Sequence, residues 1–373
     1  MTQKIIHIIG GGVAGLGLAW RLAQRGVKSA VYDKGAIGRG ASWAAAGMLA
    51  AVIEAEPGED ALIPFVLKSQ SMWREFATEL NTYTNLDIGY RESGTIFIAP
   101  ERDDEGLLKQ RFDYLKARNL PVEWLDKPEL RKREPFFSPR VTQGFYSGQD
   151  HQVDNRALVD ALHAACIKAG VALHPNSEIT EVTCAGDTIT HLIVNSERIA
   201  VEHVVLAAGA WSGSINGLPQ EILPPVFPMK GQLLSLQMDV RMPLLKHVVW
   251  TPQVYLVPRS DGRLIVGATL EDKGFDAQLT AGGILHLLRE TWEALPGIEE
   301  LPLLESWAGF RPTSRDDAPI LGPSGLKNMS FMTGQHRHGI LMTPLAAAAM
   351  CEYICDGRLP DVAAPFTINR FNV

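Results

Sequence analysis

The sequence lacks the features by which disulfide-stabilised and metal-binding proteins are recognised. It has only four cysteines in 373 residues, and they form neither a CxxC pair nor a metal-like spacing with histidine. In a chain of this length, such cysteines predict reduced, buried thiols of a cytoplasmic protein rather than a disulfide framework. The pattern also predicts that there is no metal site. The four residues are Cys166, Cys184, Cys351 and Cys355.

Long apolar runs and a strong net charge are also missing. No run approaches the ~18 apolar residues that a membrane span requires. The chain reaches the apolar stretch Ile5–Ile9 with no signal-like segment before it. The formal net charge of -7 leaves no basic footprint for nucleic acid or anionic lipid. We therefore expect a cytoplasmic protein without membrane or nucleic-acid partners.

The composition is that of a globular protein with a large core. Hydrophobic residues make up 46% of the chain and charged residues 21%, close to the average for globular domains. At roughly 100 to 200 residues per domain, the length predicts two domains, or three.

The first 33 residues read as one strand–helix–strand unit. Ile5–Ile9 is a short β-branched run of the kind that forms a buried parallel strand. Gly10, Gly12 and Gly15 then form a GxGxxG turn, and Asp33 follows the second strand. Such glycines let the backbone approach a pyrophosphate at a helix N-terminus, and the acid reaches ribose hydroxyls. The unit predicts dinucleotide binding, with a helix over Leu16–Arg25 capped by Gly26 and a strand over Val27–Tyr32.

The motif alone does not separate NAD from FAD, but two further features favour FAD. The next convincing strand of the sheet, at Val204–Gly209, lies far along the chain, whereas an NAD domain usually continues with consecutive strand–helix units. No second GxGxxG unit for a nicotinamide cofactor follows. A reaction centre assembled from distant segments suits an extended cofactor with a buried ring system.

Helical and strand patterns alternate along the rest of the chain. From about 218 to 310 the texture is β-rich and carries the hairpin signal Asp261-Gly262, which predicts an antiparallel sheet. The simplest interpretation is two domains interleaved in sequence. We expect helices at Phe65–Leu80, Asp104–Asn119, after the N-cap Asp154, and at Thr343–Ile354, and strands at Thr95–Ala99, Ile179–Thr183, Thr188–Val194, Glu202–Ala207, Tyr255–Val257 and Leu264–Val266.

Five stretches give the chain a more specific resemblance. They are Gly10–Gly15 with Asp33, Ala41–Leu49, Tyr255–Thr269, Trp307–Pro312 and Gly334–Pro344. In them the chain resembles the D-amino-acid oxidase superfamily of FAD-dependent oxidoreductases, and within it the glycine oxidases of thiazole (thiamine) biosynthesis. The resemblance implies an α/β fold in which a doubly wound FAD-binding domain of the glutathione-reductase type is interleaved with a smaller antiparallel-sheet α+β substrate domain. We place the FAD domain in residues 1–84, 150–217 and 311–373, and the substrate domain in residues 85–149 and 218–310.

The resemblance also implies which residues meet a non-covalently bound FAD. Gln335 to Leu341 should lie against the isoalloxazine, where the helix beginning near Ile340 would direct its positive end at the flavin edge that gains negative charge on reduction. Simple core packing of that helix is compatible with this role. Val182 should meet the adenine through its backbone. The residues assigned to the cofactor are Gly10, Gly12, Val13, Ala14, Gly15, Asp33, Lys34, Ala41, Ser42, Ala46, Gly47, Met48, Val182, Gln335, His336, Arg337, His338, Gly339, Ile340 and Leu341.

Three residues are assigned to the substrate by the same resemblance. Arg311 should bind the carboxylate of an amino acid, because a guanidinium matches a carboxylate in geometry and charge; from the sequence alone, a salt bridge to Asp316 or Asp317 is an equal alternative. Tyr255 should place its hydroxyl on the same carboxylate, although a tyrosine in such a strand is more often part of a core. Arg337 should cover the amine or carboxylate side.

The stretch that contains Arg337 departs from the family pattern. The family commonly has Gly-His-aromatic-Arg-Asn-Gly, whereas this chain reads Gly334-Gln335-His336-Arg337-His338-Gly339. We expect His336 and His338 to form hydrogen bonds with solvent or backbone rather than to act in catalysis or bind metal. No general base is evident, and none is required if the substrate amine arrives unprotonated.

The function that follows is FAD-dependent oxidation of glycine and other small amino acids, such as sarcosine and D-alanine, to the imine or 2-oxo acid with ammonia and hydrogen peroxide. The imine would supply dehydroglycine for thiazole synthesis, and a thiazole synthase would then be a partner of this protein. The alternatives are a D-amino-acid dehydrogenase or sarcosine-oxidase-like enzyme with another electron acceptor or substrate. The resemblance further implies a homo-oligomer.

Overall fold

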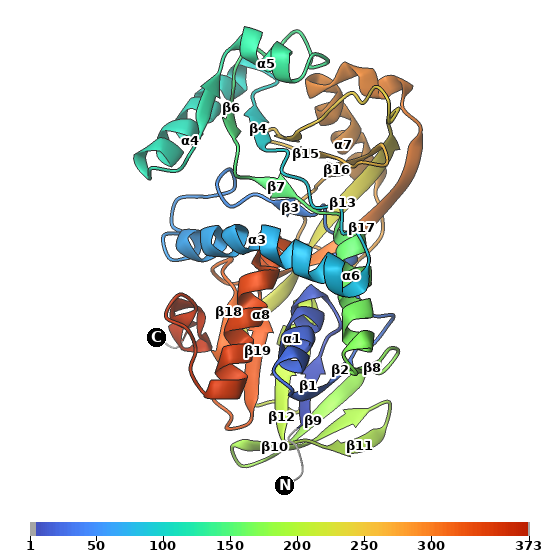
Figure 1. The fold of residues 1–373 in the computed structure, drawn as a ribbon, viewed down its shortest axis with the longest axis vertical. Helices are drawn as coiled ribbons and strands as arrows, with labels where there is room; N and C mark the ends of the chain where they lie inside the picture. Colours follow the sequence, from blue (N-terminus) through green and yellow to red (C-terminus); the bar gives the residue numbers. More distant parts are fainter. Residues whose placement is uncertain (1–4, 372–373) are drawn as a thin grey trace.

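The computed structural model describes residues 5–371 and is built around two large sheets (Figure 1). The first is a six-stranded sheet with the order β18-β19-β12-β1-β2-β8. Its strands from β19 to β8 are parallel, and β18 is antiparallel to β19. The strands are β1 (Ile5–Ile9), β2 (Lys28–Tyr32), β8 (Ala172–His174), β12 (His203–Leu206), β18 (Ile320–Pro323) and β19 (Met329–Thr333). These strands come from widely separated parts of the chain, as expected for two domains that are interleaved in sequence.

Four helices and a small sheet cover the parallel sheet on its two faces. A core that includes Ile8, Val31 and Val205 joins one face to the helices, and a second core that includes Ile9 and Leu206 joins the other face to the three-stranded antiparallel sheet β11-β10-β9. The helices are α1 (Val13–Gln24), α3 (Leu62–Thr84), α6 (Asn155–Lys168) and α8 (Gly339–Asp356); the small sheet has β9 (Ile179–Ala185), β10 (Thr188–Val194) and β11 (Glu197–Ala200).

The first strand, helix and strand confirm the predicted unit, with one shift of boundary. Helix α1 begins at Val13, earlier than predicted, so that the last glycine of the motif is helical. Gly10 has a φ of +112°, and a Cβ built on it would lie 2.2 Å from the carbonyl oxygen of Ala207 in the neighbouring strand segment. Only glycine fits this position. Gly26, at φ +75°, follows the helix as predicted.

The second large sheet has eight strands in the order β17-β13-β16-β15-β14-β4-β6-β5. Its longest pair is β13 with β17, which run antiparallel from Val226 opposite Ser314 to Leu236 opposite Leu303. The hairpin β15–β16 forms around Gly262 at φ +88°, as its sequence predicts. The strands are β4 (Thr95–Ile98), β5 (Glu123–Leu125), β6 (Gly144–Ser147), β13 (Val226–Gln237), β14 (Val248–Trp250), β15 (Tyr255–Pro258), β16 (Arg263–Gly267) and β17 (Leu303–Ser314).

Strand β17 crosses the boundary that the sequence placed between residues 310 and 311. The strand runs unbroken from Leu303 to Ser314, so Arg311 lies in the eight-stranded sheet rather than in the FAD domain. The division of the chain into two domains otherwise stays a prediction. Residues 1–4 and 372–373, which the prediction assigns to the FAD domain, lie outside the described structure. The remaining elements are α2 (Ala41–Ala44), β3 (Met48–Leu49), α4 (Glu105–Ala117), α5 (Lys127–Arg133), β7 (His151–Gln152) and α7 (Ala281–Ala294), with six short 3-10 helices.

Helix α8 is the most apolar helix of the molecule. The window His336–Asp356 meets the length and hydropathy that a membrane span requires, but 67% of it is buried inside the molecule. It packs on α1 and α3 in the core of the parallel sheet. A core position accounts for its composition.

Candidate active site

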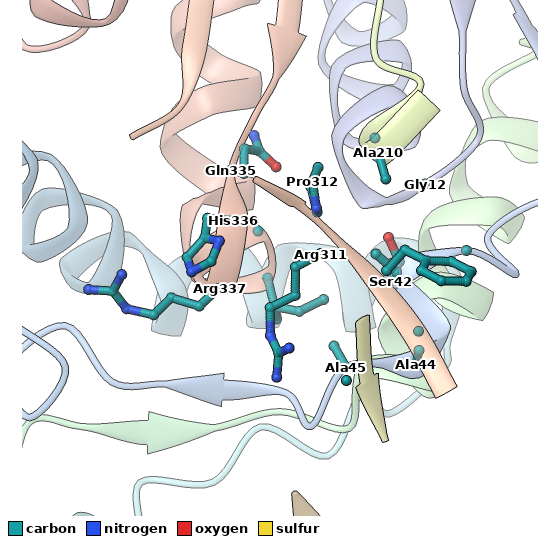
Figure 2. Close-up of a pocket in the computed structure, with 18 of the residues that line it drawn as sticks. Gly12, Ser42, Ala44, Ala45, Ala210, Arg311, Pro312, Gln335, His336 and Arg337 are labelled. Atoms are coloured by element: carbon teal, nitrogen blue, oxygen red, sulfur yellow. The ribbon is translucent and has the colours of Figure 1, made fainter. Parts of the chain in front are cut away.

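A large cavity lies between the two sheets. It has a volume of about 1160 Å³, more than the roughly 300–1,000 Å³ of an ordinary small-molecule site. Its lining combines the glycine turn before α1, the 41–48 segment, strands β15 and β17, and the turn that leads into α8. Figure 2 shows Gly12, Ser42 and Arg311 along this cavity. The size suits an extended cofactor together with a small substrate.

The glycine turn presents a bare helix N-terminus to one end of the cavity. Helix α1 has no side-chain cap at Gly12 and no acidic residue in its first turn. The Val13 N–H donates to the Ser42 hydroxyl over 3.0 Å, which fixes the 41–48 segment against the turn. A phosphate is the natural ligand of such a helix end, because the orphan N–H groups and the helix dipole favour negative charge.

Gly15 has the packing role that its place in the motif predicts. It does not line the cavity, and a Cβ built on it would lie 2.0 Å from the carbonyl oxygen of Gly10. It therefore lets α1 approach the first strand closely rather than touching a ligand.

Asp33 lies in the cavity wall at the end of β2. One of its carboxylate oxygens accepts from the Gly11 N–H and the other from the Gly35 N–H, each over 2.9 Å. These bonds brace the glycine turn against the end of the strand. A carboxylate has further lone pairs for ribose hydroxyls, so the predicted role is compatible with this geometry.

Val182 does not line the cavity, and its predicted backbone contact with the adenine stays a prediction. Its side chain is buried in the core behind the parallel sheet, and its N–H donates to the carbonyl of Asn216. Ile179, earlier in the same strand β9, does line the cavity. No local pattern in the sequence distinguishes these two β-branched residues of one strand.

Most of the remaining residues that the resemblance assigns to the cofactor line the cavity. Leu341 and His338 do not: both are buried beside the cavity wall, and the Leu341 carbonyl accepts from Ser69 and Trp73. Lys34 reaches the cavity with its ammonium 3.6 Å from the centre of the Trp211 ring. The predicted residues that line the cavity are Gly10, Gly12, Val13, Ala14, Asp33, Lys34, Ala41, Ser42, Ala46, Gly47, Met48, Gln335, His336, Arg337, Gly339 and Ile340.

The residues present fit an FAD. The uncapped N-terminus of α1 fits its pyrophosphate, and the N-terminus of α8, which begins at Gly339 without a side-chain cap, meets the same cavity. The partial positive charge at this second helix N-terminus suits the flavin ring, which gains negative charge when it is reduced.

Arg311 points from β17 into the cavity (Figure 2). The alternative of a salt bridge to Asp316 or Asp317 is not found, because Asp316 pairs with Arg370 and Asp317 lies beside His336. Among the described residues the guanidinium has no carboxylate partner, and it donates to the Thr269 carbonyl over 3.2 Å. A cation held in this way can bind an anionic group of a ligand.

Tyr255, at the start of β15, lines the cavity close to Arg311. Burial raises the pKa of its phenol, and the neighbouring Arg311 opposes that rise. The hydroxyl therefore stays protonated near neutral pH and can donate to the same anion as Arg311.

Arg337 lines the cavity, but its charge is already paired. Its guanidinium donates to a carboxylate oxygen of Glu59 over 2.6 Å and to the Glu54 carbonyl over 3.1 Å. In Figure 2 its side chain extends away from Arg311. The predicted role of Arg337 in binding substrate therefore stays a prediction.

Of the two histidines beside Arg337, His338 is buried and His336 is half-buried, and both are uncharged. Burial and the nearby arginines lower the pKa of His336 to about 3, and its Nδ1 lies 2.9 Å from the Thr313 hydroxyl. Burial also lowers the pKa of His338 well below its usual value. No cluster of three or more metal-binding side chains occurs among residues 5–371.

Glu54 is the site residue that the sequence analysis missed. It lies in the loop between β3 and α3, is 4% exposed and lines the cavity. Burial raises its pKa to about 8. A glutamate in an irregular loop carries no periodic signal that would mark it as buried.

Comparison with known proteins agrees with this geometry. Residues 6–353 match the family described as FAD dependent oxidoreductase. The chain belongs to this family. It is an FAD-dependent oxidoreductase, and the cavity is where the members of the family would hold the cofactor.

Relatives of known name share the whole length of the chain. It is 33% identical to the glycine oxidase of Geobacillus kaustophilus over 99% of this chain and 98% of that protein. It is 35% identical to the bifunctional protein ThiO/ThiG of Trichormus variabilis over 100% of this chain, which corresponds to 55% of that relative. The chain thus spans about half the length of the bifunctional relatives it matches.

Solved structures of glycine oxidases are also similar to this chain over nearly its whole length. The crystal structure of glycine oxidase from Geobacillus kaustophilus has a TM-score of 0.90 and 32% identity, covering 98% of each chain. The glycine oxidase from Bacillus cereus has a TM-score of 0.88 and 28% identity, covering 95% of this chain and 96% of that one. The fold of this chain is that of these FAD-binding oxidases.

Proposed function

We propose that this protein oxidises glycine and other small amino acids, such as sarcosine and D-alanine, with non-covalent FAD as oxidant and oxygen as the final acceptor. The observation that carries the proposal is the pair Arg311 and Tyr255, a cation and a neutral hydroxyl facing the same cavity as the dinucleotide-binding turn. Bound FAD accepts two electrons with the hydride lost from Cα. The products are then the imine or its hydrolysis products, glyoxylate and ammonia from glycine, with hydrogen peroxide.

The residues of this chain act chiefly by binding and orienting the substrate. Arg311 and Tyr255 hold the carboxylate through charge-assisted hydrogen bonds, which fixes the position of Cα in the cavity. The full-length relatives named glycine oxidase support glycine as the smallest substrate.

The purified protein should be yellow, and glycine added without oxygen should bleach the visible flavin band. Sarcosine, D-alanine and D-proline, tested in the same way, rank the substrates. A band that stays intact with every small amino acid would refute the proposal.

Oxygen as acceptor separates this proposal from a D-amino-acid dehydrogenase. In air, one peroxide should form for each glycine consumed. Turnover that depends on an added quinone or artificial acceptor, with no peroxide, would favour the dehydrogenase.

We further propose that the protein works in the cytoplasm as a homo-oligomer and passes imine to a thiazole synthase. Support for the last step is the relation to bifunctional proteins named ThiO/ThiG. Light scattering measures the oligomeric state. Added thiazole synthase should divert product from free glyoxylate, and an unchanged glyoxylate yield would argue against hand-over.

A further inference from the structure

The cavity contains one buried carboxylate that the proposed chemistry has not used. Five carboxylate residues line the cavity within residues 5–371: Asp33, Glu54, Glu56, Glu178 and Asp317. Asp33 is engaged with the glycine turn, Glu56 and Glu178 are exposed, and the Asp317 side chain is 50% exposed. Of these five residues, only Glu54 is buried and has a carboxylate that accepts no hydrogen bond from a backbone N–H.

The loop around Glu54 is rigidly held. Both carboxylate oxygens of the buried Asp150 accept from this loop, one from the Val52 N–H over 2.9 Å and one from the Ile53 N–H over 2.7 Å. Arg111 donates to the Ile53 carbonyl over 2.8 Å. These hydrogen bonds fix the backbone of the loop and therefore the position from which the Glu54 side chain extends.

The Glu54 carboxylate has a cationic neighbour but receives no hydrogen bond from the described residues. Its Oε2 lies 3.3 Å from Nε of Arg337, in a geometry that leaves this N–H without a hydrogen-bond acceptor. His338 lies 3.8 Å away and is uncharged. The other charged groups that act on Glu54 are Asp150, Arg111 and Glu56. A buried carboxylate of this kind still needs hydrogen-bond donors.

A ligand can supply those donors from the cavity. Tyr255, which faces Arg311, is close enough to Glu54 for that carboxylate to raise the pKa of its phenol, so Glu54 lies near the anion-binding pair and carries the opposite charge when it is ionised. An α-amino acid has the complementary charges, with its carboxylate and ammonium separated by a single carbon. A cation on one side of the cavity and a carboxylate on another would fix both ends of such a molecule.

We propose that Glu54 binds the amine of the substrate and accepts the proton of its ammonium form, opposite Arg311 and Tyr255. The inference rests on the proposed function and adds the base that the sequence did not reveal. In the step, one N–H bond of the ammonium breaks and an O–H bond forms on Glu54, so the pair changes from ammonium and carboxylate to amine and carboxylic acid. The neutral amine keeps the lone pair that the C=N bond of the product requires. The proton returns to water after the product leaves.

The pKa of Glu54 matches this role. Because burial raises it to about 8, the carboxylate and a substrate ammonium differ little in proton affinity, and a proton can pass between them. In the free enzyme Glu54 is protonated below that pH and cannot take up a further proton. The value of kcat/KM for glycine should therefore rise with pH up to about 8 and then level.

The decisive comparison is between Glu54→Gln and Glu59→Gln. Both remove a carboxylate near Arg337, but Glu59 does not line the cavity. Glu54→Gln should lower kcat/KM for glycine at pH 7 by roughly 10²- to 10⁴-fold, the usual contribution of a general base. It should also abolish levelling near pH 8, so that kcat/KM keeps rising toward the pKa of the substrate's own ammonium. Glu59→Gln should keep the wild-type profile.

Acetate separates loss of the amine contact from general damage to the site. It has the carboxylate but no amine, and its binding can be measured from the change in flavin absorbance without turnover. Glu54→Gln should bind acetate within about twofold of wild type, because Arg311 and Tyr255 are intact. Glu54→Asp should retain the levelling near neutral to mildly alkaline pH at a reduced rate, because it keeps an ionisable acid.

Two results would overturn the inference. One is a Glu54→Gln enzyme with the wild-type pH profile and kcat/KM; the other is equal loss of acetate and glycine, which would mean that Glu54 only supports the cavity wall. Failure of the proposed function looks different: the wild-type flavin itself would then not be bleached by glycine.

Discussion

Arg311 has no carboxylate partner among the described residues, and this makes it the sharpest residue to test. Replacing it by lysine keeps the charge but removes the planar pair of donors that a carboxylate can use. Losing one charge-assisted hydrogen bond costs ~1.5–3 kcal/mol, so Arg311→Lys should lower kcat/KM for glycine roughly 10- to 100-fold. The flavin spectrum should be unchanged. Arg315→Lys, an exposed change nearby in the chain, is the control and should leave kcat/KM as it is; equal losses in both variants would contradict the assignment.

Single residues were predictable to different degrees. Arg311 and Tyr255 were found only because the family pattern marks them, since an arginine or tyrosine in a strand has several ordinary uses. Arg337 was placed correctly in the cavity, but its pairing with Glu59 depends on a loop far away in sequence. Glu54 could not be found, because only the fold shows that this loop glutamate is buried. Side-chain partners that are distant in the chain were the part that the sequence did not show.

At the scale of elements, the turn before α1 is the feature on which cofactor binding depends. Gly10→Ala places a Cβ 2.2 Å from the Ala207 carbonyl oxygen at a φ of +112°. Backbone strain of this kind costs ~1–3 kcal/mol before the clash is counted. We expect a lower urea midpoint and purification largely without FAD, read from the visible absorbance per protein.

The matched control is Gly106→Ala in α4. This glycine has ordinary helical geometry and open space around its Cβ position. The change should stabilise the protein by roughly 0.5–1 kcal/mol and leave FAD binding intact. FAD retention in Gly10→Ala at the wild-type level would show that the turn does not hold the cofactor.

Elements with a strong local pattern were predicted well. Asp154 caps α6 by accepting from the N–H groups of Arg156 and Ala157, and the hairpin at Gly262 forms as expected. The unbroken strand β17 was cut by the predicted boundary between residues 310 and 311. Its pairing with β13 along nearly its full length is a long-range property that no local pattern contains.

At the scale of the whole molecule, Arg259 ties the eight-stranded sheet to two segments far away in sequence, those around Ala46 and Val153. It stands after β15, is buried, and donates to the carbonyls of Ala46 and Val153 over 2.7 Å each. Arg259→Ala leaves these buried acceptors without partners, at ~1–3 kcal/mol each. We expect a lower free energy of unfolding together with weaker FAD binding, since Ala46 and its neighbours line the cavity. Arg74→Ala, which removes only an exposed pair with Glu92, is the control and should leave both the free energy of unfolding and FAD binding close to wild type.

The buried carboxylates also set how stability of the whole molecule depends on pH. Burial raises the pKa of Asp150 to about 6 and that of Glu54 to about 8. Each acid ionises at lower pH in the unfolded chain, near 4, so between these values the native state binds more protons and stability falls as pH rises. The contribution of Glu54 is lost progressively from about pH 4 to about pH 8.

Glu54→Gln should therefore stabilise the protein more at pH 8.5 than at pH 5, when urea unfolding is followed at both. Glutamine keeps the shape of the side chain but never has to bury a charge. Glu59→Gln, whose carboxylate lies 2.6 Å from Arg337, should show no such gain at high pH. Glu54→Gln would then be more stable than wild type at pH 8.5 but less active. This combination is expected when a buried acid destabilises the fold but is needed for catalysis. Equal effects of Glu54→Gln at both pH values would contradict the raised pKa and weaken the case for Glu54 as the proton acceptor.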